Sequence, residues 1–310
     1  MSARQRLPTR KSNARRAAAE GQRVLRQRLR EVGNLISPAA TRWRKSGEPV
    51  HRLRVAARRA VAAVDLLQPL LPRRNARRLR RMLQQIRRAC DAARDSDVLI
   101  KRVERHGNGH GHSALIRRLQ AQRRRDQGPI VAIHRQLGVS GRWDRRTRKL
   151  LAKVRWDRRD ATGREPGYAT FIRRRLAGPA DRFEQALRAR HTSSKSLHRL
   201  CIRGKRLRYA LELAGAAVPH RRREQLDAIL RELQDHLGEI NDSAMARAAL
   251  TRGLAAGKKS FHTGRLKTLW VAEEKASEAA RKAFVKWRSQ QSPADFQDIA
   301  GAGNKIRRPG

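Results

Sequence analysis

EPVHRLRVAARRA (Glu48–Ala60) and KSLHRLCIRGKRL (Lys195–Leu207) are two stretches of one chain that share the triplet His-Arg-Leu and many basic residues. Their histidines, His51 and His198, lie 147 positions apart. In both stretches Leu, Val, Ala or Gly recurs every three or four residues, which is the period of an amphipathic α-helix. The pair therefore predicts two similar helices, each with an apolar side and a basic side.

The offset of 147 positions also holds outside these stretches, without a gap, over almost fifty residues. The matches include Arg52 and Arg199, Arg59 and Arg206, Pro72 and Pro219, Leu79 and Leu226, Leu83 and Leu230, and Asp95-Ser96 and Asp242-Ser243. Matches that keep one offset over so many residues indicate an internal duplication. Strand-like segments with turn signals are scarce, so we expect an all-α fold of two similar four-helix-type bundles.

The expected organisation is a basic disordered tail (1–17), a first bundle (18–159), a linker (160–167), a second bundle (168–290) and a flexible tail (291–310). Helices are expected near 18–36, 49–70, 74–93, 114–137 with a break at Gly128-Pro129, 142–158, 168–190, 196–217, 220–240, 243–255 and 262–289. Asp95 or Ser96 is expected to cap a further short helix after residue 93.

Charge dominates the composition, with 75 Lys and Arg against 27 Asp and Glu and a formal net charge of +48. Such charge repels itself in the compact state, so we expect an anionic partner. The two cysteines, Cys90 and Cys201, form neither a disulfide framework nor a CxxC metal motif, which fits a reducing compartment. No secretory signal or membrane-spanning run is evident, and we expect a cytoplasmic protein.

Helical spacing separates the apolar and basic residues of each copy. The expected core positions are Leu53, Ala57, Ala60, Val64, Leu67 and Leu71, and, in the second copy, Leu200, Gly204, Leu207 and Leu211. A basic stripe carries His51, Arg54 and Arg58, and its counterpart carries His198, Cys201, Lys205 and Arg208. Asp65 and Glu212 occupy equivalent positions on these stripes. Arg208 and Glu212 are four residues apart, the spacing at which side chains of opposite charge can pair on a helix.

The segment from residue 74 has an apolar face from Leu79 to Ala93 and an opposite face with Arg77, Arg80, Arg81 and Arg88. No acid lies between Asp65 and Asp91, so these arginines are expected to lack local partners. An ordinary solvated helix face can explain any one basic residue. Unpaired like charges destabilise a helix, however, and their recurrence in two copies favours a shared anionic ligand.

These residues resemble the conserved histidine α-helical domain (CHAD) family. The family's first-copy pattern H-x-x-R-V-x-x-R-R is matched by His51, Arg54, Val55, Arg58 and Arg59. Its second-copy pattern is matched by HRLCIRGKRLRY, which supplies His198, Lys205, Arg206, Arg208 and Tyr209. Arg94-Asp95 and Asn241-Asp242 also resemble turns of the family. One departure is Cys201, which stands where the family has an arginine. The resemblance covers roughly residues 20 to 290.

The resemblance implies two four-helix bundles related by a pseudo-two-fold, with basic helices lining a central groove or pore. It also implies binding of inorganic polyphosphate and association with polyphosphate granules. On this basis we expect the ligand to be held by His51, Arg54, Arg58, Arg59, His198, Lys205, Arg206 and Arg208. A second set of candidates comprises Arg52, Arg77, Arg81, Arg88, Arg199, Arg203 and Tyr209.

Two other functions are open. Nonspecific DNA or RNA binding suits the charge, although Tyr209 is the only aromatic residue on the two stripes that could stack on a base. A metal-dependent phosphohydrolase would need ligand spacing that does not accompany His51 or His198. His106, His110 and His112 could chelate a metal, but adventitious histidines in a Gly-rich loop are the simpler interpretation. We expect no catalytic residues, metal or cofactor.

Overall fold

The computed structural model describes residues 10–105, 110–155, 167–191, 193–256 and 263–291, and within these ranges it contains no strand. The all-α prediction is confirmed. The α-helices are α1 (Arg10–Thr41), α2 (Glu48–Leu66), α3 (Arg73–Arg105), α4 (His110–Arg125), α5 (Gly128–Ile133), α6 (Arg142–Leu151), α7 (Tyr168–Arg188), α8 (Ser194–Leu211), α9 (His220–Ala256) and α10 (Thr263–Ser289). Short 3₁₀ turns η1 (Gln68–Leu70) and η3 (Gly215–Ala217) precede α3 and α9, and a π-helical segment η2 (His134–Val139) follows α5.

The duplication is visible in the boundaries of the elements. α3 and α9 begin at Arg73 and His220, and η1 and η3 begin at Gln68 and Gly215, so each pair is separated by 147 positions. α1 and α7 end at the same offset. The repeat found in the sequence therefore extends to helix ends that were not part of the motifs. The domain boundaries and the pseudo-two-fold relation stay predictions.

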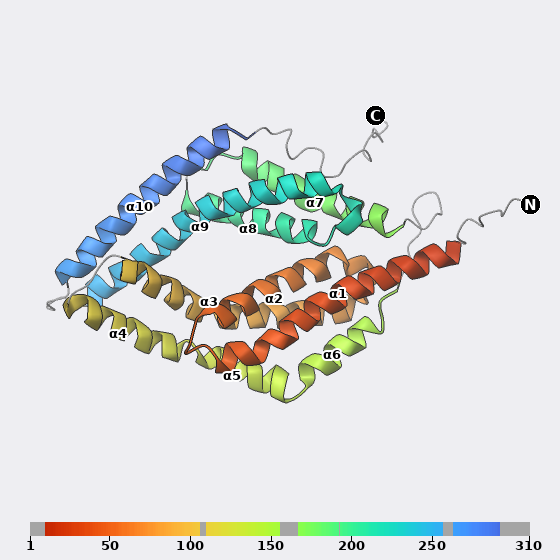
Figure 1. The fold of residues 1–310 in the computed structure, drawn as a ribbon, viewed down its shortest axis with the longest axis horizontal. Helices are drawn as coiled ribbons and strands as arrows, with labels where there is room; N and C mark the ends of the chain where they lie inside the picture. Colours follow the sequence, from red (N-terminus) through yellow and green to blue (C-terminus); the bar gives the residue numbers. More distant parts are fainter. Residues whose placement is uncertain (1–9, 106–109, 156–166, 192, 257–262, 292–310) are drawn as a thin grey trace, which may run out of the picture.

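The apolar side chains form a core that runs through both halves. It joins fully buried residues of α1, α2 and α3, such as Leu25, Leu53 and Leu83, to those of the second half, such as Phe183 and Leu230. In Figure 1 the helices of the first half lie below those of the second, and α10 runs beside α9. Burial of this apolar surface is the main force that holds the two layers together.

The core positions expected from helical spacing are buried. Leu53, Ala57, Ala60, Val64, Leu67 and Leu71 are at most 5% exposed, and Leu200 and Leu207 are fully buried. Gly204 allows α8 to pack closely on α9, because a Cβ there would lie 3.0 Å from Leu233 Cδ2 and 3.4 Å from Phe183 Cε2.

Two expected helix breaks are wrong. α3 runs without interruption through Asp95-Ser96, and α9 runs through Asp242-Ser243. Neither aspartate is a helix cap. The reason is tertiary, since the extended ends of α3 and α9 carry Val103 and Leu250 into a second apolar cluster with α10. The preference of Asp and Ser for the start of a helix is a local property and does not predict this packing.

Other boundaries differ less. α1 begins at Arg10, inside the stretch expected to be a disordered tail, and α4 begins at His110, inside the expected Gly-rich loop. The break at Gly128-Pro129 is confirmed, with Pro129 in the first turn of α5. α2 ends at Leu66 and α6 at Leu151, both earlier than expected. The first nine residues, His106, most of the 160–167 linker and residues 292–310 lie outside the described residues.

Candidate functional site

The two halves meet through equivalent helices. α2 contacts α8, α3 contacts α9 and α1 contacts α7, and each pair is related by the sequence repeat. Figure 1 shows α2 and α3 facing the layer formed by α8 and α9. The junction between the two halves is therefore built from the helices that carry the predicted basic residues of both copies, and it is the region expected to bind the anion.

At the junction, Arg54 of α2 lies beside α3. Its Nε donates to Asp91 Oδ1 at 2.7 Å, and Arg87 Nη1 donates to the other oxygen of the same carboxylate at 3.0 Å. Two guanidinium groups thus share one acid, so the cluster keeps a positive charge. This sharing also fixes both side chains in position, because each makes a charge-assisted hydrogen bond.

Arg58 lies one turn further along α2. It is partly buried, and within the described residues it has no ion pair of its own. Burial lowers its pKa, Arg54 and Arg87 lower it further, and Tyr209 of α8 and Asp91 oppose them. Arg58 is therefore a cation crowded by other cations, at a point where α2, α3 and α8 come together. A bound anion would relieve that repulsion.

His51 stands one turn before Arg54. Its Nδ1 is enclosed and has no hydrogen-bond partner among the described residues. Burial lowers the pKa of His51, and Arg94 lowers it next, followed by smaller effects of Arg54 and Arg58 against that of Glu48. The ring therefore stays neutral near pH 7 in the free protein. An anion placed here would favour its protonated, donating form.

The second copy supplies fewer cations. His198 is exposed and its Nδ1 lies 3.2 Å from Asn241 Oδ1 on α9. Lys205, the counterpart of Arg58, is partly buried and has no ion pair within the described residues. Cys201, the counterpart of Arg54, is 4% exposed and packs in the core. The position was expected on the polar stripe, but a thiol is apolar enough to be buried there.

The cluster around Asp91 is likewise absent from the second copy. The positions equivalent to Arg87, Asp91 and Arg94 hold Gln234, Gly238 and Asn241. The change at Cys201 is therefore one of four, and together they remove three arginines and the acid that holds two of them. The junction is built from matching helices but has an unequal distribution of charge.

Arg59 and Arg206 have a different environment from Arg58. Arg59 Nε lies 2.9 Å from Glu212 Oε2, and Arg28 Nη2 of α1 lies 3.2 Å from the same oxygen. Burial opposes the charge of Arg59, but Glu212 outweighs it and raises the pKa of Arg59. Arg206 acts on Asp65 in the reciprocal arrangement. These arginines thus join the two halves, and their role in ligand binding stays a prediction.

The acid Glu212 does not pair with Arg208 as its spacing suggested. The nearest acid to Arg208 is Asp227, at 3.9 Å from Arg208 Nε. Asp65 binds Arg80, whose Nε lies 3.1 Å from Asp65 Oδ1. Arg80 was expected to lack a local partner, and its partner indeed comes from α2 rather than from its own helix.

The second set of candidates is mostly peripheral. Tyr209 is 5% exposed, with the guanidinium carbons of Arg59 and Arg208 5.9 and 5.6 Å from its ring centre. Arg203 donates to the carbonyl oxygen of Arg182 on α7 at 2.7 Å. The others are exposed and make no side-chain hydrogen bond or ion pair within the described residues: Arg52, Arg77, Arg81, Arg88 and Arg199.

Asp95 and Asp242 are equivalent acids at the crossing of α3 and α9. Loss of solvating water is the largest effect on each and raises both pKa values, and the charge of Asp242 adds to the increase for Asp95. Arg94 and Arg54 lower the pKa of Asp95. The effect of Asp242 on Asp95 agrees with the contact between α3 and α9.

Sequence reasoning missed Arg28 and Arg87. Arg28 could have been found from the repeat, because an arginine, Arg175, stands 147 positions later. In the structure Arg175 donates to the carbonyl oxygens of Asp65 and Leu66. Arg87 had no such signal, since its counterpart is Gln234. Its importance comes from the approach of α3 to α2, which only the structure shows.

The part of the chain that the structure describes holds no group of three or more His, Cys, Asp or Glu side chains that could bind a metal. His106 lies outside that part, so the proposed chelation by His106, His110 and His112 is not tested. Within the same part, none of the helices combines the length and the apolarity needed to cross a membrane.

Comparisons with known proteins give one family. The family model of the CHAD domain matches residues 23–251. Two similar solved structures are the crystal structure of the CHAD domain from the plant Ricinus communis and PptA from Streptomyces chartreusis. The first is 19% identical, covers 89% of this chain and 92% of that chain, and has a TM-score of 0.66. The second is 18% identical, covers 87% and 99%, and has a TM-score of 0.65. No curated protein matches the chain.

Proposed function

The chain belongs to the CHAD domain family, a polyphosphate-binding family, and from that premise we propose that it binds inorganic polyphosphate at the junction of its two halves. The observation that carries the proposal is Arg58, a partly buried cation without an ion pair in the described residues, beside Arg54 and the unpartnered Nδ1 of His51. Residues that interact this unfavourably in the free protein gain most from an added anion.

The chemistry of the ligand suits this arrangement. Polyphosphate is a flexible chain that carries about one charge per phosphate and no base, so it is bound best by a row of cations. Arg54 and Arg58 offer forked donors to its oxygens, and Lys205 offers a mobile point charge from α8. His51 and His198 add donors at the same level of the two helices. Helices α2, α3, α8 and α9 would then line the groove.

We propose that the first half binds the phosphate chain more tightly than the second half does. Arg54 and Arg87 are already held by Asp91, so little side-chain entropy is lost when a phosphate arrives. The second copy offers His198 and Lys205 without the arginine cluster. We infer that the first copy provides most of the affinity and the second copy guides the chain across the junction.

We propose storage rather than turnover, because a row of arginine, lysine and histidine side chains is suited to holding a phosphate chain. Retention on polyphosphate granules is therefore part of the proposal. Co-sedimentation with long polyphosphate, without release of phosphate when magnesium is added, is the expected behaviour. Steady phosphate release would contradict the binding-only function.

The decisive experiment compares two variants with equal loss of charge. R54A/R58A removes two junction cations, and R135A/R145A removes two exposed cations elsewhere in the first half. In calorimetric titrations with polyphosphate of defined length, R54A/R58A should bind at least about tenfold more weakly than R135A/R145A, because each lost charge-assisted contact is worth more than one kcal/mol. Equal affinity of the two variants would remove the site.

The same titrations should include duplex DNA as a competitor near physiological salt. Long polyphosphate is expected to displace the duplex from the protein, because a flexible phosphate chain can follow the row of cations at the junction more closely than a stiff double helix can. Failure of polyphosphate to displace DNA would favour nucleic-acid binding instead.

A further inference from the structure

A row of arginines follows the side of α3 that is turned away from the junction. Its members are all exposed, and none has an ion pair within the described residues: Arg74, Arg78, Arg81 and Arg88. At about 100° per residue, each lies about 100° or more round the helix from Arg87, which shares Asp91 with Arg54 of α2. The row spans about 21 Å along the helix. It is therefore long enough to contact several phosphates of one chain.

Helix α6 widens this basic surface. Arg146 Nη1 lies 3.0 Å from Met82 Sδ of α3, and just after α6 the backbone N–H of Arg155 donates to the carbonyl oxygen of Leu70 at 3.1 Å. The helix α6 thus runs antiparallel beside the first half of α3. Lys149 is one turn from Arg146 on the same side of α6, and both are exposed. We call the surface formed by Arg74, Arg78, Arg81, Arg88, Arg146 and Lys149 the outer face.

The acids of α2, α3 and α6 that lie nearest in the sequence are turned away from the outer face. No acid stands between Asp65 and Asp91. Asp65 pairs with Arg80, and Asp91 pairs with Arg54 and Arg87. Asp144, the acid of α6, lines the cleft between α6 and α1 instead of the side next to α3. The positive charge of the outer face is therefore not compensated by these carboxylates.

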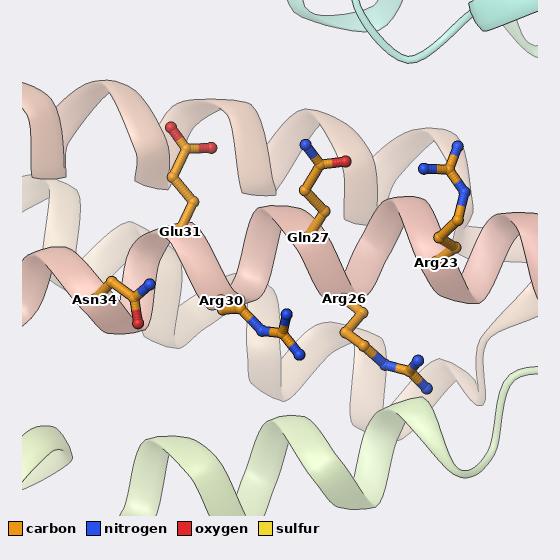
Figure 2. A pocket seen from close by; sticks show the side chains of 6 residues that line it. All are labelled: Arg23, Arg26, Gln27, Arg30, Glu31 and Asn34. Carbon is orange, nitrogen blue, oxygen red and sulfur yellow. The ribbon is translucent and has the colours of Figure 1, made fainter.

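The basic surface continues from α6 to α1. Figure 2 shows Arg26 and Arg30 pointing toward α6, on the opposite side of α1 from Glu31. Glu31 lies 3.9 Å from Arg59 at the junction. In Figure 1, α6 lies on the side of the first half that is away from α7, α8 and α9. The junction and the outer face therefore lie on different sides of the first half.

The second half shows that the fold does not require this row. The positions 147 residues after the four arginines of α3 hold Arg221, Gln225, Ala228 and Asp235. One basic and one acidic residue replace four basic ones, and α9 still runs as a regular helix through all four positions. Like charges three or four residues apart destabilise a helix. The row therefore lowers the stability of the free protein, and a bound anion would relieve the repulsion.

We propose that the outer face binds a second polyphosphate chain, so that one protein molecule bridges two chains. The inference rests on the proposed function, because its ligand is the one assigned to the junction. Guanidinium groups on successive turns of α3 offer forked donors to phosphate oxygens. A flexible chain can pass from this row over Arg146 and Lys149 toward α1, whereas a stiff duplex bends only at an energetic cost. Contacts of exposed charges are weak, so the outer face binds its chain less tightly than the junction does.

A capture assay tests the bridge. Beads that carry long polyphosphate are loaded with the full chain near physiological salt, washed, and then offered short fluorescent polyphosphate. The parent should capture the fluorescent chain on its outer face. R78E/R81E should load equally but capture at least about fivefold less per bound protein, because carboxylates replace two cations of the row. R221E/R252E makes the same change of charge at exposed positions of α9 and should capture as the parent does.

The outcomes separate the two proposals. Beads that retain no parent protein would contradict polyphosphate binding at the junction and on the outer face alike. Normal loading with equal capture by R78E/R81E and R221E/R252E would overturn the outer face alone. Preferential capture of a fluorescent DNA duplex over polyphosphate of equal charge would assign the outer face to nucleic acid and overturn the bridge. The thermal unfolding temperature of R78E/R81E should match that of R221E/R252E, since all four positions are exposed.

Discussion

At the scale of the residue, the acids of the junction decide which cations remain available to a ligand. Glu212 binds Arg28 and Arg59, and its counterpart Asp65 is influenced by Arg80, Arg206 and Arg175. The matched arginines and acids are all separated by 147 positions, namely Arg28 and Arg175, Arg59 and Arg206, and Asp65 and Glu212. Glu212 of the second half therefore holds two arginines of the first half, whereas Asp65 pairs with Arg80 of its own half and is approached by Arg175 and Arg206. Within the described residues, Arg58 and Lys205 have no such partner.

This arrangement makes Glu212→Gln informative, because stability and affinity should change in opposite directions. The variant should lower the free energy of unfolding by about 1 kcal/mol, since two partly exposed ion pairs are lost. It should also raise polyphosphate affinity severalfold, because Arg28 and Arg59 become available. Urea denaturation and calorimetry measure the two effects. Glu224→Gln, at an exposed pair with His220, is the control and should change neither.

His51 gives a second prediction, on pH. Because burial and Arg94 lower its pKa in the folded protein, the unfolded chain binds the proton more readily. Stability should therefore fall as pH falls below about 6.5. Bound phosphates have the opposite effect, since they favour the protonated ring of His51. Polyphosphate affinity should therefore rise as pH falls over the same interval. His51→Gln should flatten both dependences. Parallel slopes for parent and variant would show that His51 does not contact the ligand.

At the scale of the element, a buried charge cluster ties α3 to α9 and α10. Arg102 is 6% exposed and Glu273 is 2% exposed. Arg102 donates to both oxygens of Glu273, to both oxygens of Glu239 and to Ser243 Oγ. These four side chains lie near the second apolar cluster, and Arg102 lies beyond the point where the sequence suggested that α3 ends. The cluster fixes the position of the long helix ends.

The expected effect of Arg102→Met is a loss of about 3 kcal/mol in the free energy of unfolding, because Glu273 would remain buried without its guanidinium partner. The double variant R102M/E273Q should recover part of that loss, since the unpaired charge is removed. Urea denaturation followed by circular dichroism measures both. Arg105→Met, at an exposed position of the same helix, should stay within about 0.5 kcal/mol of the parent.

The sequence was sufficient to predict the helices whose apolar residues recur with a regular helical period. The helices from Glu48 and Lys195 and their core residues follow from spacing alone, and the repeat places them as a pair. The continuous course of α3 through Asp95 could not be predicted, because a good capping residue is tolerated in mid-helix when packing further along requires it. The Arg54–Asp91–Arg87 cluster was inaccessible for the same reason, as it depends on how α2 and α3 approach.

At the scale of the whole molecule, equivalent helices contact each other across the junction while their charges differ. α1, α2 and α3 meet α7, α8 and α9, which is the arrangement that a two-fold relation would give. The arginine cluster of the first copy has no counterpart in the second. With a net charge of +48, nearly any polyanion is attracted at low salt, so affinity alone does not identify the site.

The salt dependence of binding separates the site from the general attraction. Each phosphate neutralised in contact releases counterions and contributes roughly −0.7 to −0.9 to the slope of log affinity against log salt, by analogy with nucleic acids. R54A/R58A removes two contacts, so its slope should be shallower by about 1.4 to 1.8. R135A/R145A has the same net charge but retains the contacts, and should keep the parental slope. If both variants shift the slope equally, polyphosphate is held by the overall field of the protein rather than by the junction between α2 and α8.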